Sequence, residues 1–237
     1  MVICWKKTVM KKAVFFLLLA AAFHFSYAQF EGILTYEDNY SDALAKGKVH
    51  TVIYVSKNMG RIESTNTPMK GGVLNPQAAK SQDTLLFDFD AQKKTTLQYS
   101  SGMAYVTNID IINQQKMIES MGSTVEVQNL GQEKVGDYNC THFTMQVTNP
   151  KYKAMLEGKK EFWITKDLGN SNILFIGQYL YYLQGTYMMK KLQAAGGDGV
   201  VVKWQHGDAV CTLVNVQKKS LPAATFQPPK RYMVVNR

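Results

Sequence analysis

Much of the chain alternates between apolar and polar residues with the two-residue period of β-strands. The pattern is clear over 30–40 and 51–56, where aromatic and β-branched residues are frequent. Short turns separate many such segments, and the sequence His206-Gly207-Asp208 between two of them is typical of a hairpin. A loop is expected over 66–82, which contains two prolines and a Gly-Gly pair. About ten strands are predicted in total, in an antiparallel arrangement.

Two segments have the spacing of helices instead. Apolar residues recur among polar ones over 110–121, which suits a short amphipathic helix. The segment Ile173–Leu192 is apolar around most of its circumference and carries no charge before Lys190, so it is expected to be buried. A transmembrane span is the alternative, but two glutamines, two glycines and four tyrosines argue against it.

These elements predict a mainly β (α+β) fold. We expect a curved, unclosed antiparallel half-barrel of about ten strands, with helices packed on its concave face. No repeat of fixed period and no low-complexity linker interrupts the pattern, so residues 29–237 are expected to form a single domain.

Residues 1–28 are expected to be a cleavable secretory signal peptide. Four lysines precede the apolar run Ala13–Phe23, and Ser26-Tyr27-Ala28 provides small residues for cleavage near Ala28. The apolar run is short compared with the roughly 20 residues that a membrane-spanning helix needs. An uncut N-terminal anchor is the alternative. The expected location is the periplasm or the extracellular space.

Charge excludes one class of partner. The whole chain carries +9 at pH 7, but four of its 27 basic residues lie in the predicted signal, which leaves +5 after cleavage. No run of five basic residues occurs, so nucleic-acid binding is not expected.

Two cysteines remain after the predicted cleavage, Cys140 and Cys211. In an oxidising compartment they can form one disulfide. On their predicted strands both thiols lie on the less apolar face, which permits a bridge across one face of the sheet. Free buried thiols are the equally open alternative.

Recognisable catalytic chemistry is missing from the sequence. His50, His142 and His206 lack the spacing of a zinc helix, and no C-x-x-C occurs. No G-x-S-x-G, P-loop or dinucleotide fingerprint is present. We therefore expect no cofactor, no metal and no enzymatic activity, with a hydrolase built from dispersed residues as the less favoured alternative.

Soft apolar side chains are abundant, with ten methionines and twelve tyrosines after the predicted signal. Ordinary core filling explains most of them, but flexible thioethers also suit adaptable ligand grooves. The candidate apolar cleft is lined by residues on or near the two predicted helices: Phe175, Tyr179, Tyr182, Met188, Met189, Met117 and Met121.

Four segments together resemble a known family: Phe30–Tyr36, Val135–Cys140, Glu161–Gly169, and Phe226–Pro229 with Tyr232. The family contains exported proteins of Gram-negative envelopes and is named only as a domain of unknown function. In outline it is similar to the periplasmic lipoprotein carriers of LolA/LolB type. That resemblance implies an unclosed sheet around a hydrophobic cavity for lipid chains, and it implies no catalytic residues.

The sequence thus favours a non-enzymatic periplasmic or secreted protein that binds a lipid, a lipidated protein or another amphipathic envelope component. An envelope interaction or sensor protein that binds a protein partner is the alternative.

Overall fold

The computed structural model describes residues 29–41, 46–70, 73–74, 81–109, 115–116, 119–149, 158–171 and 185–236. Its elements, in chain order, are β1 (Gly32–Ser41), β2 (Lys46–Val55), β3 (Met59–Lys70), β4 (Val73–Leu74), β5 (Ser81–Asp88), β6 (Lys93–Gln98), β7 (Met103–Asn108), β8 (Thr124–Val135), β9 (Tyr138–Thr148), β10 (Gly158–Thr165), α5 (Gly185–Ala194), β11 (Val200–His206), β12 (Ala209–Lys218), the 3₁₀ turn η1 (Ala223–Phe226) and β13 (Met233–Asn236).

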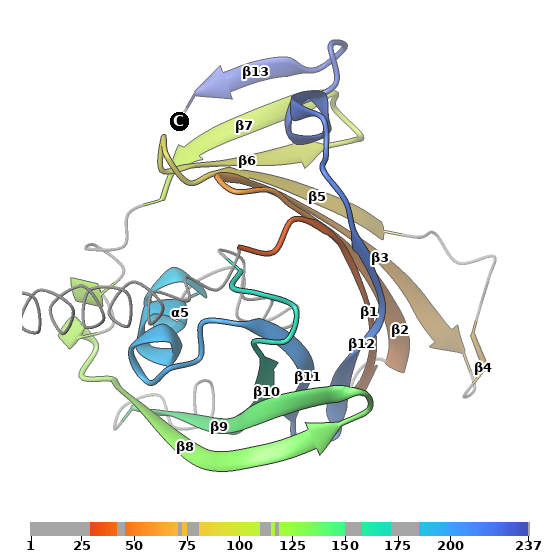
Figure 1. The fold of residues 1–237 in the computed structure, drawn as a ribbon. Helices are drawn as coiled ribbons and strands as arrows, with labels where there is room; N and C mark the ends of the chain where they lie inside the picture. Colours follow the sequence, from red (N-terminus) through yellow and green to blue (C-terminus); the bar gives the residue numbers. More distant parts are fainter. Residues whose placement is uncertain are drawn as a thin grey trace, which may run out of the picture.

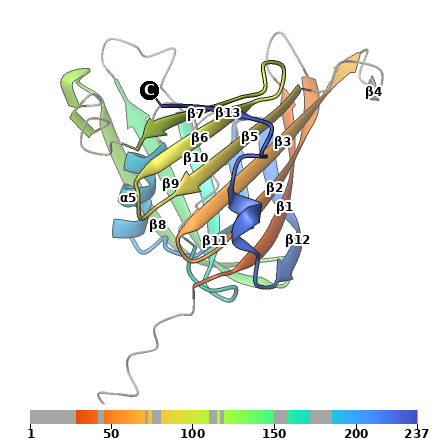
Figure 2. The same cartoon turned by 90° about the horizontal axis from the view of Figure 1, so that it is seen from above.

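One strongly curved sheet dominates the structure (Figures 1 and 2). Its strand order is β13-β7-β6-β5-β3-β2-β1-β12-β11-β10-β9-β8, and β4 pairs only with β3. All pairings are antiparallel except that of β13 with β7. The sheet is not closed, because β13 and β8 do not pair with each other. Register shifts at Thr35/Tyr36, Asn129/Gly131 and Trp163/Ile164 add to the twist that curves it.

The predicted fold class is wrong. The described residues form a nearly all-β structure, in which twelve strands pair side by side in one sheet and β4 pairs with β3. The prediction was about ten strands with helices packed on the concave face. The described residues contain one complete α-helix, the ten-residue α5, which lies beside one end of the sheet, so helices packed on a concave face are not found. Of the predicted helix Ile173–Leu192, the residues before Gly185 lie outside the described part.

Two glycines allow close approach of backbones in this sheet. Gly32 has φ +148, and a Cβ there would lie 2.0 Å from the carbonyl oxygen of Gln217 on β12. At Gly199, just before β11, a Cβ would lie 2.0 Å from the carbonyl oxygen of Thr165 on β10. Any side chain at either position would force the paired strands apart.

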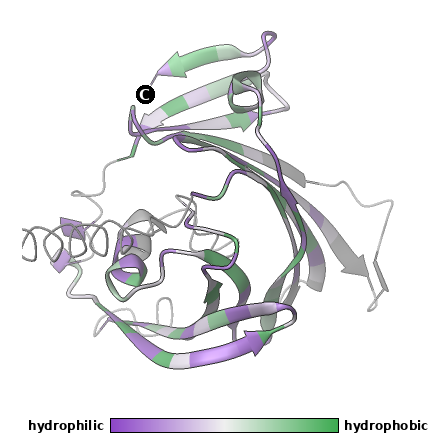
Figure 3. Ribbon diagram, viewed as in Figure 1, coloured by the Kyte–Doolittle hydropathy of each residue, from purple (hydrophilic) through white to green (hydrophobic). Residues whose placement is uncertain are grey.

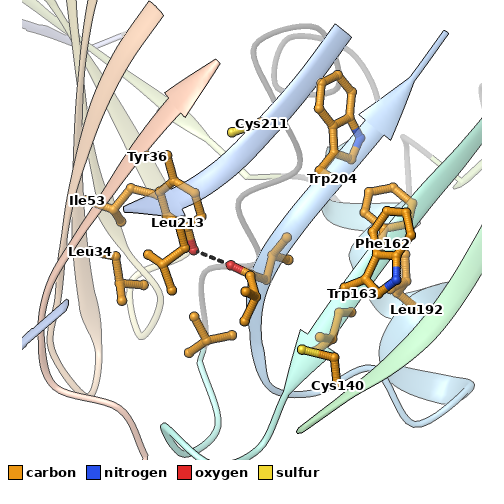
Figure 4. Packing of buried hydrophobic residues seen from close by; sticks show 14 of the residues in the cluster. Leu34, Tyr36, Ile53, Cys140, Phe162, Trp163, Leu192, Trp204, Cys211 and Leu213 are labelled. Carbon is orange, nitrogen blue, oxygen red and sulfur yellow. Dashed lines mark hydrogen bonds between the residues drawn. The ribbon is translucent and has the colours of Figure 1, made fainter. Parts of the chain in front are cut away.

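The main core cluster extends over the strands from β3 through β12 to β9, with Leu192 of α5 added to it (Figure 4). Figure 3 shows the hydrophobic residues of β11 in the middle of this region, whereas the edge strand β8 is largely hydrophilic. A smaller cluster near the other end joins Leu86, Leu97, Ala104 and Tyr232. None of the helices in the described ranges has the length and apolar character needed to span a bilayer.

Candidate functional site

The register of five neighbouring strands aligns one row of buried side chains. Phe143 on β9 pairs with Phe162 on β10, which pairs with Trp204 on β11. Trp204 pairs with Cys211 on β12, and Cys211 pairs with Asp38 on β1. Directly paired residues point to the same side of a sheet, so all five lie on one face. We call this the Trp204 row and the side that bears it the Trp204 face.

The Trp204 face is the apolar side of this part of the sheet. Ile164, two residues from Phe162, lies on it beside Leu192 of α5. A Cβ atom at Gly197 would lie within 3.0 Å of both of these side chains, which shows that they are neighbours. Tyr36 also lies on this face and donates a hydrogen bond from its hydroxyl to the carbonyl oxygen of Val201 at 2.7 Å, which connects β1 to β11 (Figure 4).

Unpaired polar atoms interrupt this apolar surface. Asp38 is 4% exposed and Trp204 is 1% exposed. Within the described part of the chain, Asp38 Oδ1 and Trp204 Nε1 have no hydrogen-bond partner, nor does Asn66 Oδ1, two strands beyond Asp38 on β3. Leaving such a group unpaired costs about 1–3 kcal/mol, so each atom marks a place where a ligand group or water would be stabilised.

Burial shifts the ionisation of the Trp204 row. It raises the pKa of Asp38 from 3.8 to about 6. It also raises the pKa of the Cys211 thiol, and the charge of nearby Asp38 adds to that effect. Cys211 therefore remains a protonated thiol at neutral pH and is poorly suited to act as a nucleophile.

The row beside the Trp204 row carries basic groups. Lys160 on β10 pairs with Met145 on β9 and with His206 on β11. Lys160 and His206 are half-buried, and the His206 ring lies 6.4 Å from the Trp204 ring, centroid to centroid. Burial lowers the pKa of Lys160. Burial, followed by the charge of Lys160, lowers the pKa of His206.

A charged cluster covers the opposite face around Trp163. The imidazole of His142 stacks on the indole with ring centroids 4.2 Å apart, and Lys203 Nζ lies 4.2 Å from the centroid of the same indole. The indole N–H donates to Glu133 Oε2 at 2.7 Å, and Glu133 and Glu161 flank His142 at 3.4 Å each. These contacts cover Trp163, which is only 5% exposed although it points away from the Trp204 face. Covering this indole is a sufficient structural role for the charged cluster.

An open groove of about 470 Å³ lies where the chain enters β1, beside the turn after β10 and the end of β12. Most of its charged groups already have partners. Lys166 pairs with Asp198 at 2.6 Å, Asp167 accepts a hydrogen bond from the Asn139 backbone N–H at 2.9 Å, and Glu31 accepts one from the Ser220 hydroxyl at 3.3 Å. The groove is therefore a weaker candidate than the Trp204 face.

The sequence-predicted cleft residues are only partly described by the structure. Met117, Phe175, Tyr179 and Tyr182 lie outside the described residues. Met188 and Met189 lie in α5, but their side chains are outside the description. Met121 is half-buried in the turn before β8, and its carbonyl oxygen accepts a hydrogen bond from Asn149 at 3.1 Å. The predicted lining of the cleft therefore stays a prediction.

The disulfide that the sequence left open is not formed. Cys140 and Cys211 are both free and buried. They belong to β9 and β12, with β10 and β11 between them, and Cys140 pairs with Thr165 on the face opposite the Trp204 row. Burial also raises the pKa of the Cys140 thiol, to about 11. The alternation within single strands could not show that the two thiols face opposite sides.

In the described residues, no three or more His, Cys, Asp and Glu side chains are grouped so as to hold a metal ion. The residues that sequence reasoning missed are Asp38, Lys160 and Trp204. Each is unremarkable in its own strand, and only the pairing of distant strands brings them together.

A comparison with protein families gives one match. The model of the domain of unknown function DUF4412 matches residues 30–232. The chain belongs to the DUF4412 family. The comparison with curated proteins gives no match. The match begins just before β1 and ends just before β13, so it includes every strand of the Trp204 face. It confirms the resemblance to a family of unknown function, whereas the envelope location and the likeness to lipoprotein carriers stay predictions.

Proposed function

We propose that this DUF4412 protein is a non-enzymatic binding protein that holds an amphipathic ligand against its Trp204 face. The ligand is a lipid, a lipidated protein or another amphipathic component of the cell envelope. The signal-like residues 1–28 support export to the periplasm or beyond.

The observation that carries the proposal is the combination of apolar and unpaired polar groups on one face. Phe143, Phe162 and Trp204 are each at most 1% exposed, so a ligand reaches them only by displacing the side chains that pack over them. The unpaired Trp204 Nε1 and Asp38 Oδ1 lie in the same row. Ligand sites are mostly apolar and contain a few placed polar groups that fix orientation. An amphiphile supplies both an apolar chain and a head group that can pair with those atoms.

Native mass spectrometry of the protein recovered from the periplasm tests this proposal. The expected spectrum contains a stoichiometric adduct that organic extraction removes and identifies as an acyl-chain compound. A clean apo mass, together with no uptake when amphiphiles are titrated into the protein, would contradict the proposal.

A protein partner is the second candidate, and the edge strand β13 favours it. Met233 and Val234 on this strand are 65% and 54% exposed. The alternative predicts that a photo-cross-linker attached to Val234→Cys gives one defined adduct in intact cells. The same cross-linker on Asp208→Cys, in the exposed turn between β11 and β12, is the matched control. Equal or absent adducts from both sites would remove this alternative.

A further inference from the structure

Two basic side chains lie side by side at the margin of the Trp204 face. Lys160 and His206 are directly paired across β10 and β11, and both are half-buried. The ion pairs formed among the described residues do not include Lys160. A partly desolvated ammonium group without a carboxylate nearby is costly, because burial removes its hydration without replacing it.

The preceding residue shows the usual arrangement for a surface lysine. Lys159 points to the opposite face and pairs with Glu161 at 3.0 Å. More than half of the Lys159 side chain is exposed. The chain therefore places two adjacent lysines in contrasting environments: Lys159 is solvated and paired, whereas Lys160 is partly buried and forms none of these ion pairs.

The electrostatics on the Trp204 face favour an anion beside Lys160. Burial lowers the pKa of Lys160, and burial together with the Lys160 charge lowers the pKa of His206. A bound anion would favour the charged forms of both groups and offset their desolvation. The acidic residue of the Trp204 row, Asp38, is on β1, three strand spacings from β10 or about 14 Å away. At that distance Asp38 does not pair with Lys160.

The neighbouring groups suit the rest of an amphiphile. Met145 flanks Lys160 on β9, and Phe162 is the next residue of β10 on the same face. The Trp204 ring lies beside His206, and its unpaired indole N–H can donate to an anionic oxygen. Along the strands the side chains thus change from basic, which suits the head group of an amphiphile, to apolar, which suits its alkyl chain.

We propose that the ligand of the Trp204 face is an anionic amphiphile, whose carboxylate or phosphate group binds at the half-buried Lys160 and His206 while its chain displaces the packing over the buried Trp204 row. This inference rests on the proposed function and adds the charge and orientation of the ligand. Carboxylate and phosphate share the required chemistry, and the experiment below separates them.

The test compares three ligands of equal chain length: laurate, dodecyl phosphate and dodecanol. Binding is measured by calorimetry on the wild-type protein, Lys160→Met and the matched control Lys159→Met. One charge-assisted contact is expected to make at least one of the two anions bind about tenfold more tightly than the alcohol. Lys160→Met should abolish that preference, and Lys159→Met should retain it. The preferred anion identifies the head group.

Equal binding of anions and alcohol by the wild-type protein would overturn this inference and leave the proposed function standing. No binding of any amphiphile would overturn both. Equal loss of preference in the two lysine variants would also overturn it, because general surface charge would then explain the effect. Circular dichroism checks that both variants fold, and His206→Gln provides a second variant that should weaken the anion preference.

Discussion

Replacing Asp38 by Asn should stabilise the protein near pH 7.5. Asp38 is buried among Val49, Cys211 and the rest of the Trp204 face, and its Oδ1 lacks a hydrogen-bond partner in the described residues. Burial raises its pKa from 3.8 to about 6. The folded state therefore binds the proton more tightly than the unfolded state does. Stability is highest when both states are protonated and falls as pH rises from about 4 to about 6.

The magnitude follows from that shift. A change from 3.8 to about 6 corresponds to about 3 kcal/mol of lost stability above pH 6. Residual solvent near the carboxyl reduces this to about 2 kcal/mol. Asn has nearly the same shape and no charge, so the Asp38→Asn variant should recover about 2 kcal/mol near pH 7.5 and almost nothing at pH 4.

Urea unfolding followed by tryptophan fluorescence measures the difference at both pH values. Asp208→Asn, in the exposed β11–β12 turn, makes the same change of charge and should have little effect at either pH. An Asp38→Asn variant that is destabilised equally at both pH values would refute the reasoning, because the carboxyl would then be held by a contact that does not depend on its charge.

Three further outcomes are expected. In the native protein at pH 8, Cys140 and Cys211 should resist a thiol reagent, because both thiols are buried and have raised pKa values. Both should react once the protein is unfolded without a reducing agent. A lack of reaction in the unfolded protein would show that they are bonded. Leu192→Ala should lower the free energy of unfolding by about 2–5 kcal/mol, since the side chain is fully buried in the core; a smaller loss in urea unfolding would show that α5 is loosely attached. Gly199→Ala should lower the free energy of unfolding by at least about 3 kcal/mol, because its Cβ would meet a carbonyl oxygen of β10. Gly207→Ala has open space around its Cβ and should cost only about 1 kcal/mol for its positive φ. Equal costs for the two variants would contradict the register of β10 and β11.

Local turn chemistry was enough to predict some of the strands. The β11–β12 hairpin turns at Gly207, which has φ +58, so the predicted hairpin is confirmed. A glycine within a strand is harder to interpret from sequence, because it is also a turn residue. β8 continues through Gly131 as a bulge, because the Asn129 side chain accepts a hydrogen bond from the Gly131 N–H at 2.8 Å.

Other strands depended on pairing between distant segments. β3 extends into the predicted loop, with Thr67 paired to Lys48 and Pro68 to Gly47. β13, which was not predicted, pairs in parallel with β7 far earlier in the chain. Neither propensity nor spacing within a segment carries this information, because non-local partners satisfy the backbone of these residues.

The candidate site was even less accessible from sequence. Alternation placed Cys211 with Leu213 on one face of β12, but the prediction that this is the less apolar face is wrong, because both residues are buried whereas Val214 on the other face is 51% exposed. Alternation also could not show which face of β9 or β10 joins it. Strand order decides that Trp204 and Phe162 continue the same row. The contrast between Lys159 and Lys160 follows from the same register and from nothing in the local sequence.

The position of the ligand is the central claim, and the two tryptophans on opposite faces of the sheet test it directly. In a Trp5→Phe background, Trp163→Phe leaves Trp204 as the emitter, and Trp204→Phe leaves Trp163. An amphiphile brominated on its chain quenches only fluorophores that it touches. The account predicts saturable quenching of Trp204 and none of Trp163; quenching of Trp163 alone, or of neither, would contradict it.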